Sequence, residues 1–344
     1  MGFEFLHQHG GRRLWRYADQ AAPPADDTDP TTSPEAPAVF RDFEIASGDW
    51  GAIPVSAATP APGDWPRRFI DGCYQGETVA WLQDDDGHPL PVRLAEIGGV
   101  CLRLEGRTLG RETAAVERVV AAIVDPFPGA EIGEFAAALS AEGYRLVRVP
   151  PRNGTLSYDL RIHREDARVA VLHELPKLEQ VALLHDRGVP SLVDGRLGRF
   201  PNCGFDGWDV VGVIKRQVED YLHPHGHRVL LGLQPGERTP AFELASKHLP
   251  VVSWYLKLAG GDGAMPDWGV VRVEIPVSSF ERHGRDWGYL DRLSNCLLKL
   301  RCRQHSYARG PVSLEPIVRA EESLKALLTP LLALTQHFYR VSQL

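Results

Sequence analysis

The chain twice places an Asp-Gly pair after a short apolar run, once in residues 69–73 and once in residues 191–196. A strand that ends in Asp-Gly can present its carboxylate at the rim of a sheet, because glycine lets the backbone turn away without a Cβ clash. Two such carboxylates, here Asp71 and Asp194, could form the first part of the metal site of a metal-dependent nuclease. The alternative for each pair is an ordinary turn, since Asp and Gly are common in turns.

A helix is expected between the two aspartates, over about residues 165–185, because apolar residues recur there on one helical face. Glu174 and Glu179 border this face, so either carboxylate could reach the end of a neighbouring strand, and the alternative for each is a solvated charge. Pro176 lies between them and is expected to kink or interrupt the helix. Carboxylates from separate elements suit Mg²⁺ or Mn²⁺, and a pair of such ions could activate water for phosphodiester hydrolysis.

Several basic residues are candidates for contacts with phosphate. Lys257 and Arg272 lie on strand candidates 251–258 and 269–276, with pairing to Glu274 as the alternative. The other candidate groove cations, each equally well explained as a surface charge, are Arg67, Arg68, Lys215, Arg216, Lys299, Arg301 and Arg303. The triplet His223, His225 and His227 could bind a transition metal, but its Pro and Gly favour a surface loop. The chain has no phosphate-binding P-loop, so any ATP use belongs to a partner.

Composition limits the class of protein. The 344 residues carry a net charge of −7, which argues against nonspecific coating of nucleic acid but not against a local basic groove. No apolar run approaches the roughly 20 residues of a membrane span, and the N-terminus lacks a signal-peptide pattern, so we expect a cytoplasmic protein. Five cysteines without a Cys-x-x-Cys pair argue against a disulfide framework and a thiolate zinc site.

We expect two parts, an N-terminal extension over residues 1–65 and a catalytic domain over residues 66–344. The extension begins with a possible docking arm at residues 3–17 and continues into a Pro/Ala/Asp-rich linker at residues 21–38. In the domain, strands are expected at 67–73, 77–83, 98–105, 144–149, 189–194, 210–215, 228–233, 251–258 and 269–276. Helices are expected at 132–142, 165–185, 287–301 and 316–339. This order favours a mixed α/β sheet covered by helices, with one apolar and one charged face on strand 269–276.

These segments, taken in order, resemble the NurA nucleases. The resemblance rests on residues 70–72, a helix with Glu, and residues 192–195, 213–216, 254–258 and 271–276, and it spans roughly residues 67–328. It implies a ribonuclease-H-like core, Mn²⁺-dependent exo- and endonuclease activity on DNA, a homodimer, and work with a hexameric HerA translocase. Asp71 and Asp194 would then be metal ligands, together with a Glu from the helix between them.

The chain departs from the family pattern near its C-terminus, where residues 313–321 occupy the place of a Tyr-Pro-x-Pro-Leu-x-x-Ala-His motif. Glu321 can replace the final ligand, because a carboxylate suits Mn²⁺ at least as well as imidazole. Ser313 replaces the tyrosine, which leaves the tyrosine's role in doubt. Of the two helix candidates, Glu174 is slightly preferred over Glu179, because it leaves more helix between ligand and loop.

The sequence therefore favours a divalent-metal-dependent DNase, with Asp71, Asp194, a helix Glu and Glu321 as ligands and Lys215, Lys257 and Arg272 as phosphate contacts. The alternative is a catalytically inactive subunit that binds DNA or docks to a translocase, with Ser313 marking decay of the site. A third option is a ribonuclease-H-type enzyme that acts on RNA. The expected setting of such an enzyme is DNA repair or antiviral defence.

Overall fold

The computed structural model describes residues 3–14, 39–56, 65–200, 203–215, 221–245, 249–260, 265–303 and 310–344. The linker expected at residues 21–38, and Arg216, lie outside them. Within these residues, twelve strands form one sheet. Along the sheet they are β1 (Val39–Asp42), β10 (Phe242–Ala245), β11 (Val251–Lys257), β12 (Val270–Pro276), β8 (Val210–Ile214), β7 (Ser191–Asp194), β3 (Arg68–Gln83), β4 (Pro89–Glu105), β5 (Thr108–Ala122) and β6 (Tyr144–Arg148), with β2 (Ile53–Pro54) and β9 (Glu237–Arg238) beside β11.

The centre of this sheet has the arrangement expected of a ribonuclease-H-like core. Strands β3, β4 and β5 pair antiparallel, while β7 runs parallel to β3 on its other side and β8 runs parallel to β7. The chain passes from β5 to β7 through β6 and the long helix α3 (Leu160–Leu184). The fold is therefore a mixed α/β sheet flanked by helices, as the sequence predicts.

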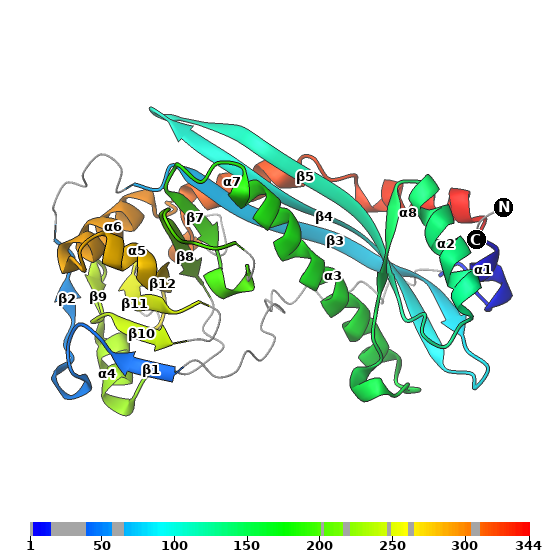
Figure 1. The fold of residues 1–344 in the computed structure, drawn as a ribbon, viewed down its shortest axis with the longest axis horizontal. Coiled ribbons are helices and arrows are strands. Elements are labelled where there is room, and N and C mark those ends of the chain that lie inside the picture. Colours follow the sequence, from blue (N-terminus) through cyan, green and yellow to red (C-terminus); the bar gives the residue numbers. More distant parts are fainter. Residues whose placement is uncertain are drawn as a thin grey trace.

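Two sets of helices cover opposite faces of the central strands (Figure 1). On β3, Ile70 packs in one cluster with Ala182 and Leu183 of α3, whereas its neighbour Phe69 packs in another with Ile317. Because side chains alternate along a strand, α3 and the C-terminal helices must lie on different sides. The latter are α5 (Val277–Arg282), α6 (Trp287–Leu300) and α7 (Glu315–Lys325).

The far half of the long β3–β5 hairpins has its own core. Strands β3, β4 and β5 are 16, 17 and 15 residues long and extend well beyond the short parallel strands. Three helices pack there (Figure 1): α1 (Glu4–Gln8), α2 (Gly129–Ala141) and α8 (Leu331–Ser342). Phe5 of α1 stacks on Phe135 of α2 at 4.8 Å, so the start of the chain packs against this core.

Residues 39–56, which belong to the expected extension, also join the fold. Strand β1 pairs with β10 and β2 pairs with β9. The carboxylate of Glu44 lies 2.8 Å from the guanidinium of Arg238, whose Nε also contacts Asp291 of α6 at 2.7 Å. Arg238 is fully buried. This buried ion network ties the segment to the sheet and to α6.

Several sequence-based expectations are wrong. The first Asp-Gly pair does not end a strand, because β3 continues through Asp71 and Gly72 to Gln83 and Gly72 pairs with Gly99. The segment 228–233 is helical, within α4 (Pro224–Gly232), because Pro224 and an N-cap at His223 start a helix there. The expected helix 316–339 is broken at Thr329 and Pro330, between α7 and α8.

Strand β12 also differs from its predicted one-sided pattern. All seven residues of β12 are buried, including Arg272 and Glu274, because helices or loops cover both faces. Helix α3 continues through Pro176, so the proline does not interrupt it. Among the described residues, no helix combines the length and the apolar character needed to cross a membrane.

Candidate active site

Asp71 and Asp194 lie side by side where strand β7 ends. The β3–β7 register pairs Phe69 with Leu192 and Ile70 with Val193, so the next residues along are the two aspartates. Gly195 has a φ of +113°, a backbone conformation that lets the chain leave the sheet directly after Asp194. Strand β3 continues past this point, which leaves Asp71 buried, with 6% of its surface exposed.

Helix α3 contributes Glu179 to the same place. A Cβ added at Gly72 would overlap the Glu179 carboxylate, and a Cβ at Gly99, the register partner of Gly72, would lie 2.6 Å from the backbone of Leu178. Two paired glycines therefore let the helix lie close to the sheet, with the Glu179 carboxylate against Gly72 and near enough to Asp71 to raise its pKa. Glu179 itself is 1% exposed.

Glu174, the slightly preferred helix candidate, does not join the aspartates. Its carboxylate forms ion pairs with Lys177, at 2.6 Å, and with Arg145 of β6, at 2.9 Å. Strand β6 lies on the far side of β5 and β4 from β3. The preference for Glu174 is therefore wrong as to position, and Glu179 is the helix carboxylate at the site.

Glu321 enters from the opposite face of the sheet, on α7. Ala320 and Leu324 of this helix pack on Val100 and Leu102 of β4. The residues after α7 are also anchored, because Thr329 donates hydrogen bonds from its backbone N–H and its hydroxyl to Glu96, at 2.6 and 3.0 Å. These contacts fix α7 across β3 and β4, and Glu321 is close enough to Asp71 to act on its pKa.

Lys215 places a cation among these carboxylates. It follows the last residue of β8, and its Nζ lies 2.7 Å from Oδ2 of Asp194. Its side chain is 11% exposed. We call Asp71, Glu179, Asp194, Lys215 and Glu321 together the Asp71 cluster.

Charge in the Asp71 cluster is unevenly compensated. Burial raises the pKa of Asp71 well above its usual value, the nearby Asp194 carboxylate raises it further, and Lys215 lowers it only in part. Glu179 and Glu321 add to the rise in the pKa of Asp71. For Lys215, burial alone would lower the pKa, but attraction to Asp194 and Asp71 leaves that pKa above its usual value. The cluster thus holds more negative charge than Lys215 neutralises.

Two further cations and a thiol at this site were not identified from the sequence. Arg199 sits in the 3-10 turn Leu197–Arg199, and its Nη2 lies 2.6 Å from the Glu179 carboxylate. Lys325 lies one helical turn after Glu321 and contacts it at 2.6 Å. Burial and the nearby Asp71 raise the pKa of Cys73 to about 12. The i,i+4 spacing of Glu321 and Lys325 was a usable signal, whereas nothing in the sequence pairs Arg199 with Glu179.

Lys257 and Arg272, predicted as phosphate contacts, do not belong to the cluster. Arg272 pairs in register with Ile214, one residue before Lys215, so the side chains of Arg272 and Lys215 leave opposite faces of the sheet. Arg272 instead lies 3.3 Å from Glu274 and over the ring of Tyr221. The Nζ of Lys257 donates to the carbonyl of Pro266 at 2.9 Å. Both cations therefore have their contacts outside the cluster.

The remaining candidates have separate positions. Arg68 is fully buried, and its guanidinium binds Glu112 and backbone carbonyls of α3, so it is not a groove cation. Arg67 is exposed, and Lys299 lies over the ring of Trp65. Ser313 is completely buried, and its Oγ has no hydrogen-bond partner among the described residues.

The histidine triplet lies at the start of α4 and is used for structure. His223 caps the helix by accepting a hydrogen bond from the backbone N–H of Gly226 at 3.0 Å. His225 donates from Nε2 to the carbonyl of Trp50 at 3.0 Å. The helix start replaces the predicted loop, and the ring of His223 packs edge-on against Trp50 at 5.1 Å.

One compact set of potential metal ligands lies elsewhere. In the described parts of the chain, the ligand atoms of Asp84, Asp86 and His88 come within 4.8 Å of one another, in the turn between β3 and β4. We call this group the Asp84 turn. The carboxylates of the Asp71 cluster do not meet that distance, and Asp194 instead binds the Lys215 ammonium.

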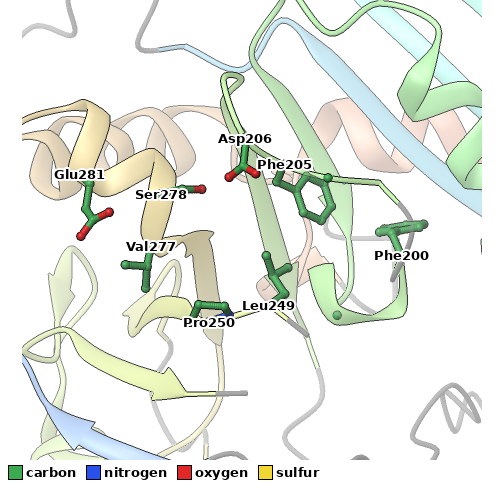
Figure 2. Close-up of a pocket in the computed structure, with 10 residues that line it drawn as sticks. Phe200, Phe205, Asp206, Leu249, Pro250, Val277, Ser278 and Glu281 are labelled. Atoms are coloured by element: carbon green, nitrogen blue, oxygen red, sulfur yellow. The ribbon is translucent and has the colours of Figure 1, made fainter. Parts of the chain in front are cut away.

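A surface cavity of about 300 Å³ lies beyond Arg199. Figure 2 shows Val277 and Ser278 of α5 facing Phe205 and Asp206 across it, with Leu249 and Pro250 below. Phe200 also lines the cavity, and the guanidinium of Arg199 lies 4.9 Å from the centre of the Phe200 ring. The cavity is therefore separated from Glu179 by these two side chains.

Comparison with solved structures finds distant structural similarity. No family model and no curated protein matches the chain. The solved structure of the NurA nuclease from Sulfolobus solfataricus aligns over 82% of this chain and 84% of its own, with 14% sequence identity and a TM-score of 0.36. Neither value assigns the chain to a family, so its function has to be inferred from the site.

Proposed function

We propose that this protein is a divalent-metal-dependent nuclease that hydrolyses phosphodiester bonds in DNA. The observation that carries the proposal is the meeting of four carboxylates from four separate elements, Asp71 of β3, Glu179 of α3, Asp194 of β7 and Glu321 of α7. Buried charges of one sign are costly unless a counter-charge is present. Such a convergence is difficult to account for by stability alone.

The donor set fits a hard divalent cation. Mg²⁺ and Mn²⁺ prefer carboxylate oxygens and keep several waters, so three or four carboxylates around a partly open space suffice. Burial and the neighbouring carboxylates raise the pKa of Asp71, and a dication bound at the cluster would favour the charged form of Asp71. Asp71, Asp194, Glu179 and Glu321 would hold the metal. When bound, it would lower the pKa of a coordinated water and stabilise charge on the phosphate.

The chain's own residues would orient the substrate. Lys215 lies directly after the end of β8. Its ammonium group has three N–H donors and suits a phosphate oxygen beside the scissile bond. Lys325 is 61% exposed next to Glu321 and can contact the adjacent phosphate. The β3–β7 register would hold the two ligands Asp71 and Asp194 rigidly on neighbouring strands.

The finer attributes of the proposal come from the sequence resemblance to NurA nucleases. They are Mn²⁺ as the preferred metal, exo- and endonuclease activity, a homodimer, and a HerA-like hexameric ATPase as partner in DNA end processing or defence. Cytoplasmic localisation belongs with them. Each remains a proposal for this chain, as does the boundary between an extension over residues 1–65 and a nuclease domain over residues 66–344.

The direct test is a cleavage assay. Purified protein is incubated with linear duplex DNA, single-stranded DNA and single-stranded RNA of one sequence, with Mn²⁺, Mg²⁺ or EDTA. We expect DNA cleavage that requires the metal and that Asp194→Asn lowers roughly 100- to 1000-fold, while Glu174→Gln, a carboxylate on the same helix as Glu179 but outside the cluster, retains activity.

Different outcomes separate the alternatives. Cleavage confined to RNA would move the protein to the ribonuclease option, and equal cleavage by Asp194→Asn would remove the cluster from the reaction. No cleavage, together with DNA binding that does not respond to metal, would favour the inactive subunit. Ser313 is the observation that favours the inactive subunit. Its hydroxyl is buried without a hydrogen-bond partner among the described residues, and it stands where the family pattern has a larger residue.

A further inference from the structure

Three of the four carboxylates each form an ion pair with a cation of the protein. Lys215 contacts Asp194 at 2.7 Å, Arg199 contacts Glu179 at 2.6 Å, and Lys325 contacts Glu321 at 2.6 Å. Among the described residues Asp71 forms no ion pair, and it accepts a hydrogen bond from the backbone N–H of Gly72 at 2.8 Å. The protein thus supplies its own partial counter-charge at the place where a metal would bind.

Lys215 differs from the other two cations in position. Lys325 is mostly exposed, so solvent screens its charge, and Arg199 lies over the Phe200 ring beside the cavity. The side chains of Lys215 and Arg199 are similarly buried, at 11% and 9% exposed, but Lys215 follows a strand held on both sides, β8 between β7 and β12. Its ammonium is attracted to Asp194, Asp71 and Glu321, which come from three elements.

We propose that Lys215 is the built-in counter-cation of the Asp71 cluster, which holds the carboxylates together without metal and must leave Asp194 when a divalent cation binds. This inference rests on the proposed function, because it assumes that the cluster takes a metal. The reason is geometric and electrostatic. Lys215 uses Oδ2 of Asp194, an oxygen that a metal would also need, and an ammonium and a dication repel each other at contact distance.

Displacement gives the site an order of events. While Lys215 neutralises Asp194, its ammonium is engaged inside the protein. Once a dication takes over that role, the four-carbon side chain is free to turn toward a phosphate at the same site. Metal binding would therefore release a DNA contact, and metal and Lys215 would compete for Asp194 but cooperate on the substrate.

The competition makes an unusual prediction for removal of the lysine. Lys215→Met, in the full-length protein, should bind Mn²⁺ roughly five- to tenfold more tightly than wild type by calorimetry, because the metal no longer displaces an ammonium. In EDTA the variant should melt at a lower temperature, since the carboxylates lose their counter-charge. Its melting temperature should then rise more on addition of Mn²⁺ than that of wild type.

Matched variants guard against a folding defect. Lys215→Gln removes the charge but keeps a polar side chain and should reproduce the tighter binding, whereas Lys215→Arg keeps the charge and should resemble wild type. Lys177→Met removes a lysine that pairs with Glu174 outside the cluster, and it should leave Mn²⁺ affinity unchanged.

The outcomes distinguish the two proposals. Mn²⁺ binding by wild type that is unchanged or weakened in both Lys215→Met and Lys215→Gln would overturn the counter-cation role and leave the nuclease proposal standing. Absence of Mn²⁺ binding in wild type and in both variants would overturn the metal site itself, and the counter-cation role with it.

Discussion

Two groups of carboxylates lie near the two ends of β3, and they differ in how their charge is handled. The Asp84 turn comes from five consecutive residues, and its members satisfy one another. Oδ2 of Asp84 contacts Nδ1 of His88 at 2.8 Å, and the backbone N–H of His88 donates to Oδ1 of Asp84. Burial alone would raise the pKa of Asp84, but the hydrogen bonds from His88 lower it below its usual value.

The Asp71 cluster has the opposite character. Its carboxylates come from four elements far apart in the sequence, and the pKa of Asp71 is raised by burial and by like charges. The Asp84 turn has the shorter ligand distances, yet its Asp84 carboxylate is hydrogen-bonded by His88 and its Asp86 is exposed. The comparison teaches that unsatisfied buried charge, assembled by the fold, is a better sign of a functional site than proximity of ligand atoms.

The largest expected effect separates these two groups directly. Asp71→Asn should reduce metal-dependent DNA cleavage roughly 100- to 1000-fold, because a neutral amide no longer supports a bound cation. Asp84→Asn, the same change at the Asp84 turn, should leave the cleavage rate within about twofold of wild type, since Asp84 lies beyond the other end of β3 and away from the Asp71 cluster. Initial rates at saturating Mn²⁺ measure both. An equal loss in the two variants would abolish the distinction.

The sequence predicts the ingredients of the Asp71 cluster better than their geometry. Asp71, Asp194, Lys215 and Glu321 are all identifiable as candidates, and the short parallel strand that ends at Asp194 is visible in its apolar run. The β3–β7 register that joins the aspartates is not visible, because pairing between residues more than 100 positions apart leaves no local signal. The length of β3 was missed because Asp71-Gly72 looks like a turn, whereas here Gly72 stays in the strand and faces the helix.

The helix carboxylate and the strand cations show the same limit. Glu174 and Glu179 have the same side chain and lie on the same helix. The close approach of α3 to the sheet at Gly72 and Gly99 is what places Glu179 at the site. Lys257 and Arg272 lie on the predicted strands, but side chains alternate between the two faces of a strand, and these two leave the face opposite to the cluster. Mixed α/β architecture follows from local patterns, whereas side-chain convergence depends on register and helix depth.

A smaller effect should distinguish the two glutamates of α3. Glu179→Gln should lower the cleavage rate and the Mn²⁺ affinity roughly 10- to 100-fold, because the amide keeps the shape but loses the charge beside Asp71. Glu174→Gln should change neither, since that carboxylate pairs with Arg145 and Lys177. Titration of Mn²⁺ in the cleavage assay and by calorimetry gives both quantities. A larger loss in Glu174→Gln would restore the sequence-based preference.

The depth of α3 can be changed without touching a charged residue. Gly99→Ala places a methyl group 2.6 Å from the backbone of Leu178, so α3 must move outward and carry Glu179 with it. We expect a loss of about 1–3 kcal/mol in the free energy of unfolding, as for overpacking elsewhere, together with weaker Mn²⁺ binding. Gly133→Ala in α2 meets open space and should instead stabilise by about 0.5–1 kcal/mol. Chemical denaturation and calorimetry measure the two effects, and full Mn²⁺ affinity in Gly99→Ala would show that Glu179 does not depend on this contact.

The smallest expected effect concerns the metal-free protein. Because burial and like charges hold the folded-state pKa of Asp71 well above its usual value, the protonated form stabilises the fold at low pH, and that stability is lost as pH rises through the folded pKa. Asp71→Asn removes this titration, so in EDTA the variant should be more stable than wild type at neutral pH. The difference should shrink as the pH falls below about 4, because Asp71 then becomes protonated in the unfolded chain as well as in the folded one. Thermal unfolding in EDTA across this range measures it. Asp84→Asn should behave in the opposite way and lower stability at neutral pH, because the Asp84 carboxylate is stabilised by His88 in the folded protein. If both variants destabilise the metal-free protein at neutral pH, the Asp71 cluster is as well satisfied as the Asp84 turn and its charge gives no sign of a metal.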